Sequence, residues 1–392
     1  MSLAHLSQIN VYPVKSVGGV TLSSAWVELQ GLSFDRRFML AMADGSMVTA
    51  RKHPQMVKVK ASLLPHGFVF TAEGKEPLKI SYAEFKKQET PATVWKDNFT
   101  AYTTTDKAND WFSDIIGQHV ELLYCGEQSN RVRKKIGHNV SFADGYPVLL
   151  ISQASLDELN RRSSEVHSMT QFRTNLVISG TEPFAEDCWK TIRIGEVVFD
   201  IVKPCERCIL TTVDTKKGTF RISKEPLKTL MTFRADEQGG VFFGQNLVAR
   251  NEGVITASDR VEVLEYQERQ DYADRAPAKR EKVADELDLD DEFDLDDELF
   301  QAKVPEFKSL TLTVNGKSFV GNNQQTLLEQ AEDAGLKIAS KCRVGLCGAC
   351  KVSVESGKVE HADVPVLKLS KGLDNIAFAC SCVPQTHCEI IS

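Results

Sequence analysis

Hydrophobic and polar residues alternate in short runs along the first two thirds of the 392-residue chain. Alternation with a period of two residues buries one face of a strand, so each run predicts a β-strand. Turn-forming pairs such as Asp44-Gly45 separate the runs, which cover residues 9–14, 24–29, 38–43, 57–63 and 68–71. Many short strands with few helices favour barrels over a doubly wound sheet. We therefore expect a multidomain and mainly β protein.

Two helices interrupt this pattern. The first extends from Asp106, as its N-terminal cap, to Gly117, and the second begins at Ser152 or Ser155. Short polar residues at the start and glycine at the end are typical of helix boundaries. The chain has no G-x-G-x-x-G segment that opens a helix and no G-x-x-x-x-G-K-[ST] segment. The usual phosphate-binding loops for dinucleotides and nucleoside triphosphates are therefore absent from the sequence.

A different pattern begins near residue 306. Residues 308–314 alternate as a strand, Asn315-Gly316 is a hairpin-turn pair, and residues 317–320 fit the returning strand. A helix from Thr326 to Gly335 follows. Strand, strand and helix in this order predict a small α+β domain over residues 306–392.

Charge separates these two regions. Residues 285–298 hold ten acidic residues and no basic one, in a chain whose net charge is −7. Runs of like charge repel one another, so we expect residues 268–305 to form an acidic flexible linker. The alternative is that apolar residues within the run, such as Leu289 and Phe293, dock onto a partner. Basic residues elsewhere form no stripe with interleaved aromatic residues, which argues against binding to a nucleic acid polymer.

The ten cysteines favour a reducing compartment, because at least four of them have the spacing of metal ligands. The first residues show no signal-peptide pattern, and no apolar run reaches the length of a membrane helix. We therefore expect a cytoplasmic protein without a membrane partner.

Four cysteines near the C-terminus indicate an iron–sulfur site. Cys342, Cys347 and Cys350 follow the spacing C-x4-C-x2-C, and Cys380 lies about thirty residues later. This set resembles the plant-type [2Fe–2S] ligands, and the strand–strand–helix order before it resembles the β-grasp fold of those ferredoxins. The alternative is a zinc site, but zinc knuckles favour paired C-x2-C units. The resemblance selects Cys380 as the fourth ligand rather than Cys382.

A second C-x-x-C pair, Cys205 and Cys208, allows three interpretations. A thioredoxin-like pair requires a helix after the motif, whereas a β-branched run follows here. A zinc half-site requires two further ligands, and only Cys125 and Cys188 are left over. The third interpretation is a single thiolate on a redox-active metal, with Arg207 beside it.

Residues 202–214 closely resemble the signature of MOSC-domain proteins, which are named after the C-terminal domain of molybdenum cofactor sulfurase. Five further segments resemble blocks of the same family, and together they span nearly all of residues 1–267. These segments are residues 12–16, 34–38, 47–51, 172–178 and 243–246. In the fourth of them, Thr174 replaces the proline that is usual in the family. The large part is similar to the mitochondrial amidoxime-reducing component. The resemblance implies a β-rich N-terminal domain over residues 1–125 and a β-barrel cofactor domain over residues 126–267.

The resemblance also implies a molybdenum–pterin cofactor with one protein thiolate on the metal. Its motif position makes Cys208 the metal ligand and catalytic residue, while Cys205 is either a supporting thiol or part of the packing. Lys15, Ser16, Arg36 and Arg173 match family blocks and suit the phosphate of the pterin. We expect Ser152, Asn175 and Thr211 to form hydrogen bonds with the pterin or its phosphate. Arg37 and Arg51 lie in matching blocks too, where a surface ion pair is the simpler interpretation.

The family chemistry is reduction of N-hydroxylated compounds, including hydroxylaminopurines, hydroxylamines and amidoximes, to amines. Because no flavin or NAD(P)H motif is visible, we expect a separate NAD(P)H-dependent flavoprotein reductase to supply the [2Fe–2S] cluster with electrons. Two other classes stay open at this point. One is a flavin- and NADH-dependent reductase with a fused ferredoxin that serves an oxygenase, and the other is a carrier of molybdenum cofactor or sulfur.

Overall fold

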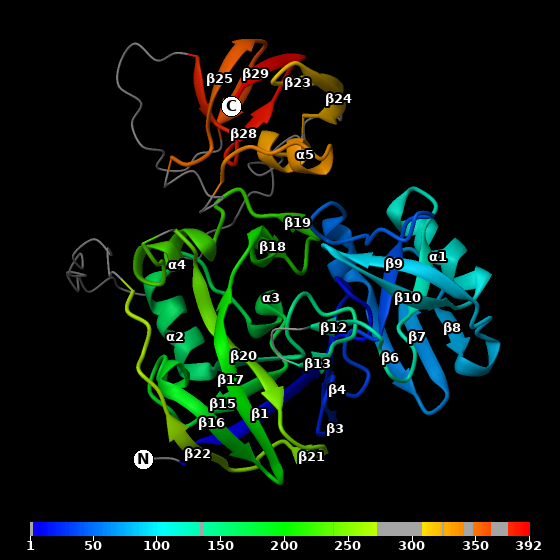
Figure 1. Ribbon diagram of the computed structural model, residues 1–392, viewed down its shortest axis with the longest axis vertical. Helices are drawn as coiled ribbons and strands as arrows, with labels where there is room; N and C mark the ends of the chain where they lie inside the picture. Colours follow the sequence, from blue (N-terminus) through cyan, green and yellow to red (C-terminus); the bar gives the residue numbers. More distant parts are fainter. Residues whose placement is uncertain are drawn as a thin grey trace, which may run out of the picture. The chain divides into compact units, whose positions relative to one another are not determined.

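The computed structural model describes residues 3–133, 137–237, 239–272, 308–323, 325–340, 348–361 and 375–392. The chain divides into two compact units, Met1–Tyr272 and Ala273–Ser392 (Figure 1). Strands dominate both units, so the prediction of a multidomain, mainly β protein is confirmed. No helix in the described part of the chain is long and apolar enough to cross a membrane.

The largest sheet of the first unit has eight strands in the order β2-β1-β15-β14-β20-β17-β16-β22. It curls so far that the two ends approach each other: Leu6 N–H donates to Asp259 O at 2.8 Å, and Val261 N–H donates to Ala4 O at 2.9 Å. The sheet is therefore barrel-like. Its strands are β1 (His5–Val11), β2 (Val20–Leu22), β14 (Val148–Ser152), β15 (Leu176–Ser179), β16 (Trp189–Ile194), β17 (Val197–Glu206), β20 (Phe242–Ala249) and β22 (Val261–Tyr266).

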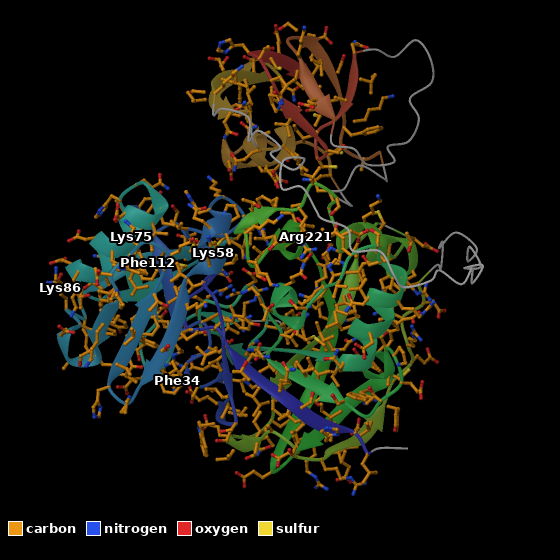
Figure 2. All side chains as sticks on the ribbon, turned by 180° about the vertical axis from the view of Figure 1, so that it is seen from behind. Phe34, Lys58, Lys75, Lys86, Phe112 and Arg221 are labelled. Carbon is orange, nitrogen blue, oxygen red and sulfur yellow. The ribbon has the colours of Figure 1, made fainter. Side chains whose placement is uncertain are left out.

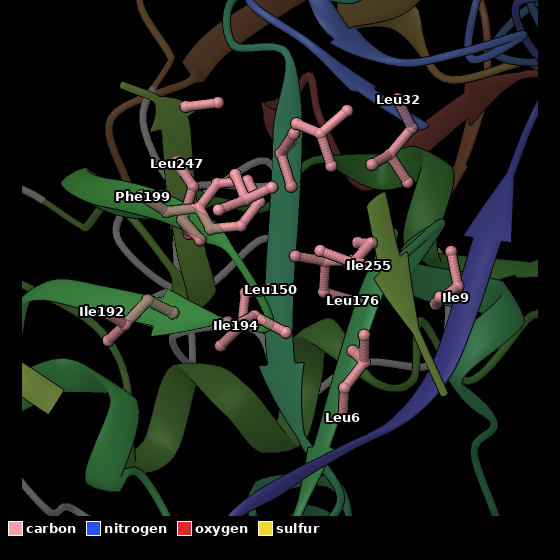
Figure 3. Packing of buried hydrophobic residues seen from close by; sticks show 14 of the residues in the cluster. Leu6, Ile9, Leu32, Leu150, Leu176, Ile192, Ile194, Phe199, Leu247 and Ile255 are labelled. Carbon is pink, nitrogen blue, oxygen red and sulfur yellow. The ribbon is translucent and has the colours of Figure 1, made fainter. Parts of the chain in front are cut away.

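The concave face of this sheet encloses the first hydrophobic core (Figure 3). Leu6, Leu150, Leu176 and Phe199 come from four different strands and are fully buried. A second sheet contributes to the same core and consists of β3 (Ser24–Glu28), β4 (Gly31–Leu32) and β21 (Gly253–Thr256). Strands from the first 32 residues therefore share a core with strands that follow residue 147, and the proposed boundary at residue 125 stays a prediction.

A second core lies between two smaller sheets and helix α1 (Asp106–Ile116). Phe112 points from α1 into this core, where its ring lies 5.2 Å from that of Phe70 (Figure 2). The helix was predicted, but its cap is Thr105, whose hydroxyl accepts from Ala108 N–H at 3.2 Å. The two sheets are formed by β5 (Phe38–Ala41), β11 (Glu121–Tyr124), β10 (Asp97–Thr103) and β9 (Glu89–Val94), and by β6 (Lys60–Leu64), β7 (Gly67–Thr71) and β8 (Leu78–Ser81).

The strand expected over residues 57–63 begins later than predicted. Pro54–Lys58 forms a 3₁₀ helix, η1, and β6 starts only at Lys60. Proline favours the first helical position because its φ angle is already helical and it has no N–H to satisfy. Alternation alone did not reveal this turn.

The remaining helices of the first unit are short: α2 (Gln153–Arg162), α3 (Met169–Phe172) and α4 (Leu227–Phe233). Ser152 caps α2, with its hydroxyl accepting from Ser155 N–H at 3.1 Å, which decides between the two predicted starts. Further 3₁₀ helices and two-stranded ribbons are η2 (Tyr82–Glu84), η3 (Ala185–Cys188), η4 (Ile209–Thr212), β12 (Val132–Arg133) with β13 (His138–Asn139), and β18 (Val213–Asp214) with β19 (Thr219–Phe220).

The second unit is built on a five-stranded sheet in the order β24-β23-β29-β25-β27. Asn315 and Gly316 both have positive φ angles, as the predicted hairpin turn requires. Helix α5 (Leu327–Asp333) has a capping box between Thr326 and Glu329, and Gly335 follows its end with a φ of 74°. The strands are β23 (Ser309–Val314), β24 (Lys317–Asn322), β25 (Lys351–Ser356), β27 (Ile376–Phe378) and β29 (Cys388–Ile391), and β26 (Val359–His361) pairs with β28 (Cys382–Pro384).

The acidic run at residues 285–298 lies outside the described residues. Residues 268–272, which we expected to begin the linker, belong to the first unit. Arg269 pairs with Asp187 at 3.5 Å, and the ring of Tyr272 lies 5.9 Å from that of Phe242.

Candidate functional site

A cavity of about 260 Å³ opens in the first unit and collects residues from segments that are far apart in the sequence. Its lining includes seven of the residues predicted from the sequence, namely Lys15, Ser16, Arg36, Arg173, Asn175, Cys208 and Thr211. Ser16, Arg36, Trp95 and Arg173 line it with positive φ angles of 68°, 47°, 58° and 55°. Left-handed backbone is unfavourable for residues other than glycine and is concentrated at functional sites in proteins. The strained backbone therefore marks this cavity as a candidate site.

Lys15 and Asp144 form an ion pair at one side of the cavity. The Lys15 ammonium donates to Asp144 Oδ1 at 2.5 Å and to Phe142 O at 3.0 Å. The lysine side chain is 7% exposed, whereas that of Asp144 is 58% exposed. Burial lowers the pKa of Lys15, although the charge of Asp144 opposes this. Desolvation alone would raise the pKa of Asp144, but the charges of Lys15 and Arg51 outweigh it and lower that pKa overall.

Arg36 is held almost completely by protein groups. Its Nη1 donates to Asp35 Oδ2 at 2.5 Å and to Asn175 Oδ1 at 3.0 Å, and its Nη2 donates to Arg173 O at 3.0 Å. Asn175 also accepts from Leu149 N–H at 3.1 Å, so its amide oxygen already has two donors. Within the protein, Asn175 thus orients Arg36.

Arg173 has a donor without a partner. Its Nη1 donates to Val17 O at 2.6 Å and its guanidinium lies 4.2 Å from the centre of the Tyr12 ring, but its Nη2 is buried and unbonded. Burial and the nearby charge of Arg36 lower the pKa of Arg173 to about 10. A buried donor with no acceptor costs about 1–3 kcal/mol, and more when it is charged. This position therefore calls for an anionic ligand.

Arg207, between the two cysteines of the C-x-x-C pair, repeats this arrangement. Its Nε donates to Phe243 O at 2.8 Å and its Nη1 donates to Phe172 O at 3.2 Å, whereas its Nη2 is buried without a partner. Gly244 allows β20 to approach β14 closely at this point, because a Cβ atom on residue 244 would lie 2.4 Å from Ile151 Cγ1. The neighbouring residue Phe243 thereby takes the position in which its carbonyl accepts from Arg207. Two arginines at one cavity thus each present an unsatisfied donor.

Cys208 lies where β17 has ended and η4 begins, and its side chain is partly exposed at the cavity. Arg51 Nη2 donates to Cys208 Sγ at 3.2 Å. Thr211 donates its hydroxyl to Cys208 O at 2.9 Å, which fixes the backbone of the turn. Cys205 also lines the cavity, where its Sγ lies 3.8 Å from Glu206 O, and burial raises the pKa of its thiol.

Ser152 is not brought to the cavity. It is fully buried as the cap of α2, and its hydroxyl lies 2.7 Å from Ser155 Oγ. Arg37, one of the two alternative candidates, does not line the cavity either; it pairs with Glu28 at 3.1 Å. Arg51 does line it and contacts the sulfur of Cys208.

The sequence reasoning missed several residues of this cavity, among them Asp144 and Trp95. Trp95 is 44% exposed, its indole N–H donates to Asp144 Oδ1 at 3.0 Å, and the guanidinium of Arg51 lies 4.3 Å from its ring centre. Neither residue belongs to a motif, and only its position in the fold reveals it. An exposed tryptophan between turn residues is a weak sequence signal, since apolar side chains at the surface are common.

In the second unit, the described residues include two of the four predicted cluster ligands. Cys350 and Cys380 bring their sulfur atoms to 3.1 Å from each other, and both side chains are buried. Cys342 and Cys347 lie outside the described residues. Cys382 and Cys388 are also buried, and burial raises the pKa of the Cys382 thiol to about 12. Which cysteines bind iron stays a prediction.

Comparison with known proteins identifies the class. Residues 3–119 match the MOSC N-terminal beta barrel domain, residues 137–262 the MOSC domain, and residues 312–385 the 2Fe-2S iron-sulfur cluster binding domain. The chain therefore belongs to the MOSC-domain family that includes the mitochondrial amidoxime-reducing components, and a [2Fe–2S] ferredoxin domain follows its MOSC part.

The individual relatives cover different shares of the chain. Human mitochondrial amidoxime-reducing component 1 is 31% identical over 289 residues, which are 66% of this chain and 82% of the human protein. The rice molybdenum cofactor sulfurase is 30% identical over 264 residues, but this chain spans only 32% of its length. Among solved structures, the ferredoxin reductase in carbazole 1,9a-dioxygenase is 24% identical and covers 22% of this chain and 28% of its own, with a TM-score of 0.21.

Proposed function

We propose that the cavity binds a molybdenum–pterin cofactor with Cys208 as the protein ligand of the metal, and that the chain reduces N-hydroxylated compounds. The observation that carries the proposal is the pair of buried, unpartnered guanidinium donors, Arg173 Nη2 and Arg207 Nη2, in the cavity that Cys208 lines. A phosphate-bearing anion next to a thiolate-bound metal would satisfy both.

The chemical character of the lining fits this cofactor. Arginines provide planar forks for phosphate oxygens, and the Lys15 ammonium adds a point charge that is already fixed by Asp144. Arg36 supports Arg173 by donating to its backbone carbonyl. Cys208 supplies a soft thiolate ligand with a hydrogen-bond donor, Arg51, directed at its sulfur. We assign the metal to Cys208 rather than Cys205, because Arg51 donates to the sulfur of Cys208, whereas the sulfur of Cys205 lies against Glu206 O and burial raises the pKa of that thiol.

The cofactor, when bound, supplies the two-electron chemistry at the metal. The overall reaction is R–NHOH plus two electrons and two protons giving R–NH2 and water. The protein residues hold the metal ligand and set the charge of the cavity. Arg51 restrains the sulfur of Cys208, and Thr211 restrains the backbone of that residue. The carboxylate of Asp144 stays ionised because Lys15 and Arg51 lower its pKa.

Electrons enter through the second unit in this proposal. The [2Fe–2S] domain match implies a one-electron carrier, and plant-type clusters have potentials of about −400 mV, low enough to reduce many acceptors. We propose that a separate NAD(P)H-dependent flavoprotein reductase reduces this cluster.

The test is elemental analysis combined with turnover. The purified protein should contain one molybdenum and two iron atoms per chain and reduce a hydroxylamine when reductase and NAD(P)H are present. Molybdenum content without any reduction of hydroxylamines would favour the cofactor-carrier alternative. A bound flavin, with oxidation of NADH by the chain alone, would favour the oxygenase-reductase alternative instead.

A further inference from the structure

We propose that Arg51 is the positioning residue of the Cys208 sulfur, and that Trp95 and Asp144 clamp it there. The inference deepens the proposed function and rests on it. A surface ion pair is the simpler interpretation of Arg51 in the sequence, and the structure places its Nη2 at 3.2 Å from Cys208 Sγ. The two residues are separated by 157 positions in the chain, so only the fold brings them together.

An aromatic contact restrains the arginine in this position, and a hydrogen bond holds the aromatic ring in turn. Its guanidinium lies 4.3 Å from the centre of the Trp95 ring, a distance at which a cation and an aromatic face attract each other. The indole N–H of Trp95 in turn donates to Asp144 Oδ1 at 3.0 Å. Trp95 has a φ angle of 58°, a conformation that is unfavourable for a bulky residue and that the surrounding structure must enforce.

Asp144 connects this clamp to the proposed phosphate side of the cavity. Its Oδ1 accepts from both the Trp95 indole and the Lys15 ammonium, at 3.0 Å and 2.5 Å. One carboxylate oxygen therefore orients both Lys15 and Trp95, two side chains of the cavity lining. A chain of contacts leads from Lys15 through Asp144, Trp95 and Arg51 to the sulfur of Cys208.

A cationic donor on a metal-bound thiolate has a definite electronic consequence. It withdraws electron density from the sulfur and stabilises the more reduced metal, so it raises the reduction potential of the site. Loss of Arg51 should lower that potential. Loss of Trp95 should act in the same direction but less strongly, because the arginine stays present and only its orientation is released.

The experiment compares Arg51→Met, Arg51→Lys and Trp95→Leu with Lys52→Met. Lys52 is an exposed neighbour outside the cavity lining, so its replacement removes one positive charge nearby without touching the sulfur. The readouts are molybdenum content, the molybdenum(V) electron paramagnetic resonance signal, the midpoint potential of the metal, and turnover with an artificial electron donor.

We expect Arg51→Met to shift the midpoint potential downward, alter the resonance signal and slow turnover by about tenfold to a hundredfold, the usual effect of losing a partner of a metal ligand. Arg51→Lys should lie between Arg51→Met and the wild type, and Lys52→Met should match the wild type. If Arg51→Met fails to retain molybdenum, a lowered potential in Arg51→Lys and Trp95→Leu still supports the assignment.

A molybdenum-loaded Arg51→Met or Arg51→Lys protein with wild-type potential and resonance signal would overturn this inference and leave the proposed function standing. Equal shifts of the midpoint potential in Lys52→Met and in the Arg51 variants would also overturn it, since the loss of any nearby positive charge would then explain the shift. A wild-type protein that binds no molybdenum would overturn the proposed function and the inference together.

Discussion

The two sulfur sites of this chain are built on opposite principles. Cys208 lies at a partly open cavity among charged groups, and an arginine from a distant segment contacts its sulfur. Cys350 and Cys380 lie in an apolar core, 2% and 3% exposed, with Ala377, Phe378 and Cys382 among their neighbours in the same cluster. The charges around the first sulfur suit the anionic cofactor that we propose, and the open cavity provides access for a substrate. The dry surroundings of the second pair suit electron transfer, which needs no access for a substrate.

The comparison predicts that the two sites fail independently. Cys208→Ala should abolish reduction of hydroxylamines, with no measurable turnover by any electron donor, because the metal loses its protein ligand. The visible spectrum of the [2Fe–2S] cluster should be unchanged. Cys205→Ala, the matched control, should retain most of the activity, and equal inactivation by both substitutions would contradict the assignment of a single ligand.

The second unit offers the converse change. Cys380→Ser should remove the cluster spectrum and stop turnover that is driven by NAD(P)H and the reductase, while turnover with an artificial donor to the molybdenum continues. Cys382→Ser is the control, since burial raises the pKa of that thiol to about 12 and keeps it protonated. A cluster that survives in Cys380→Ser but is lost in Cys382→Ser would reverse the ligand assignment.

The unpartnered arginine donors should have a smaller effect than the cysteines. Arg173→Ala and Arg207→Ala should each lower the molybdenum content or cofactor affinity by about tenfold to a hundredfold, because a hydrogen bond to a charged group contributes about 1.5–3 kcal/mol. Affinity can be followed by cofactor transfer into the cofactor-free protein. Arg161→Ala removes an exposed helix arginine that pairs with Glu158 and should change nothing. Wild-type affinity in both cavity variants would show that the buried donors serve another purpose.

The smallest effect concerns the pH dependence of stability in the first unit. His167 is 3% exposed, and burial together with the charge of Arg221 lowers its pKa to about 4. Its unfolded pKa is about 6.5, so protonation favours the unfolded state as the pH falls from about 6.5 toward 4. Lowering the pH from 7 to 5 should therefore reduce the free energy of unfolding by about 2 kcal/mol through this histidine.

Denaturant unfolding of the wild type and His167→Gln at pH 7 and pH 5 measures this contribution. The variant is less stable at pH 7 if its new side chain packs poorly, but its loss of stability between the two pH values should be about 2 kcal/mol smaller. The cluster spectrum of the second unit serves as an internal reference. Identical pH dependence in both proteins would mean that His167 titrates normally.

The sequence by itself determined the local features of this protein. The hairpin at Asn315-Gly316 and the capped helix from Thr326 depend on the conformational preferences of a few adjacent residues, and both occur as predicted. Alternation predicted runs that overlap β1, β3, β5, β6 and β7 of the first unit, but it missed the 3₁₀ helix at Pro54–Lys58, which is too short to show a pattern. The sequence also showed the family resemblance of residues 202–214 and of the segment that begins at Cys342, and the domain matches confirm both.

Only the tertiary structure decided which charged residues share a site. Arg51 and Arg37 were equivalent in the sequence, yet one contacts Cys208 and the other pairs with Glu28. A serine such as Ser152 can bind a phosphate, but here its hydroxyl caps the start of α2. The contacts that gather such residues can join distant segments, as the 157 positions between Arg51 and Cys208 show. A curled sheet sets those contacts through its strand order and register, and no local pattern of residues encodes that register.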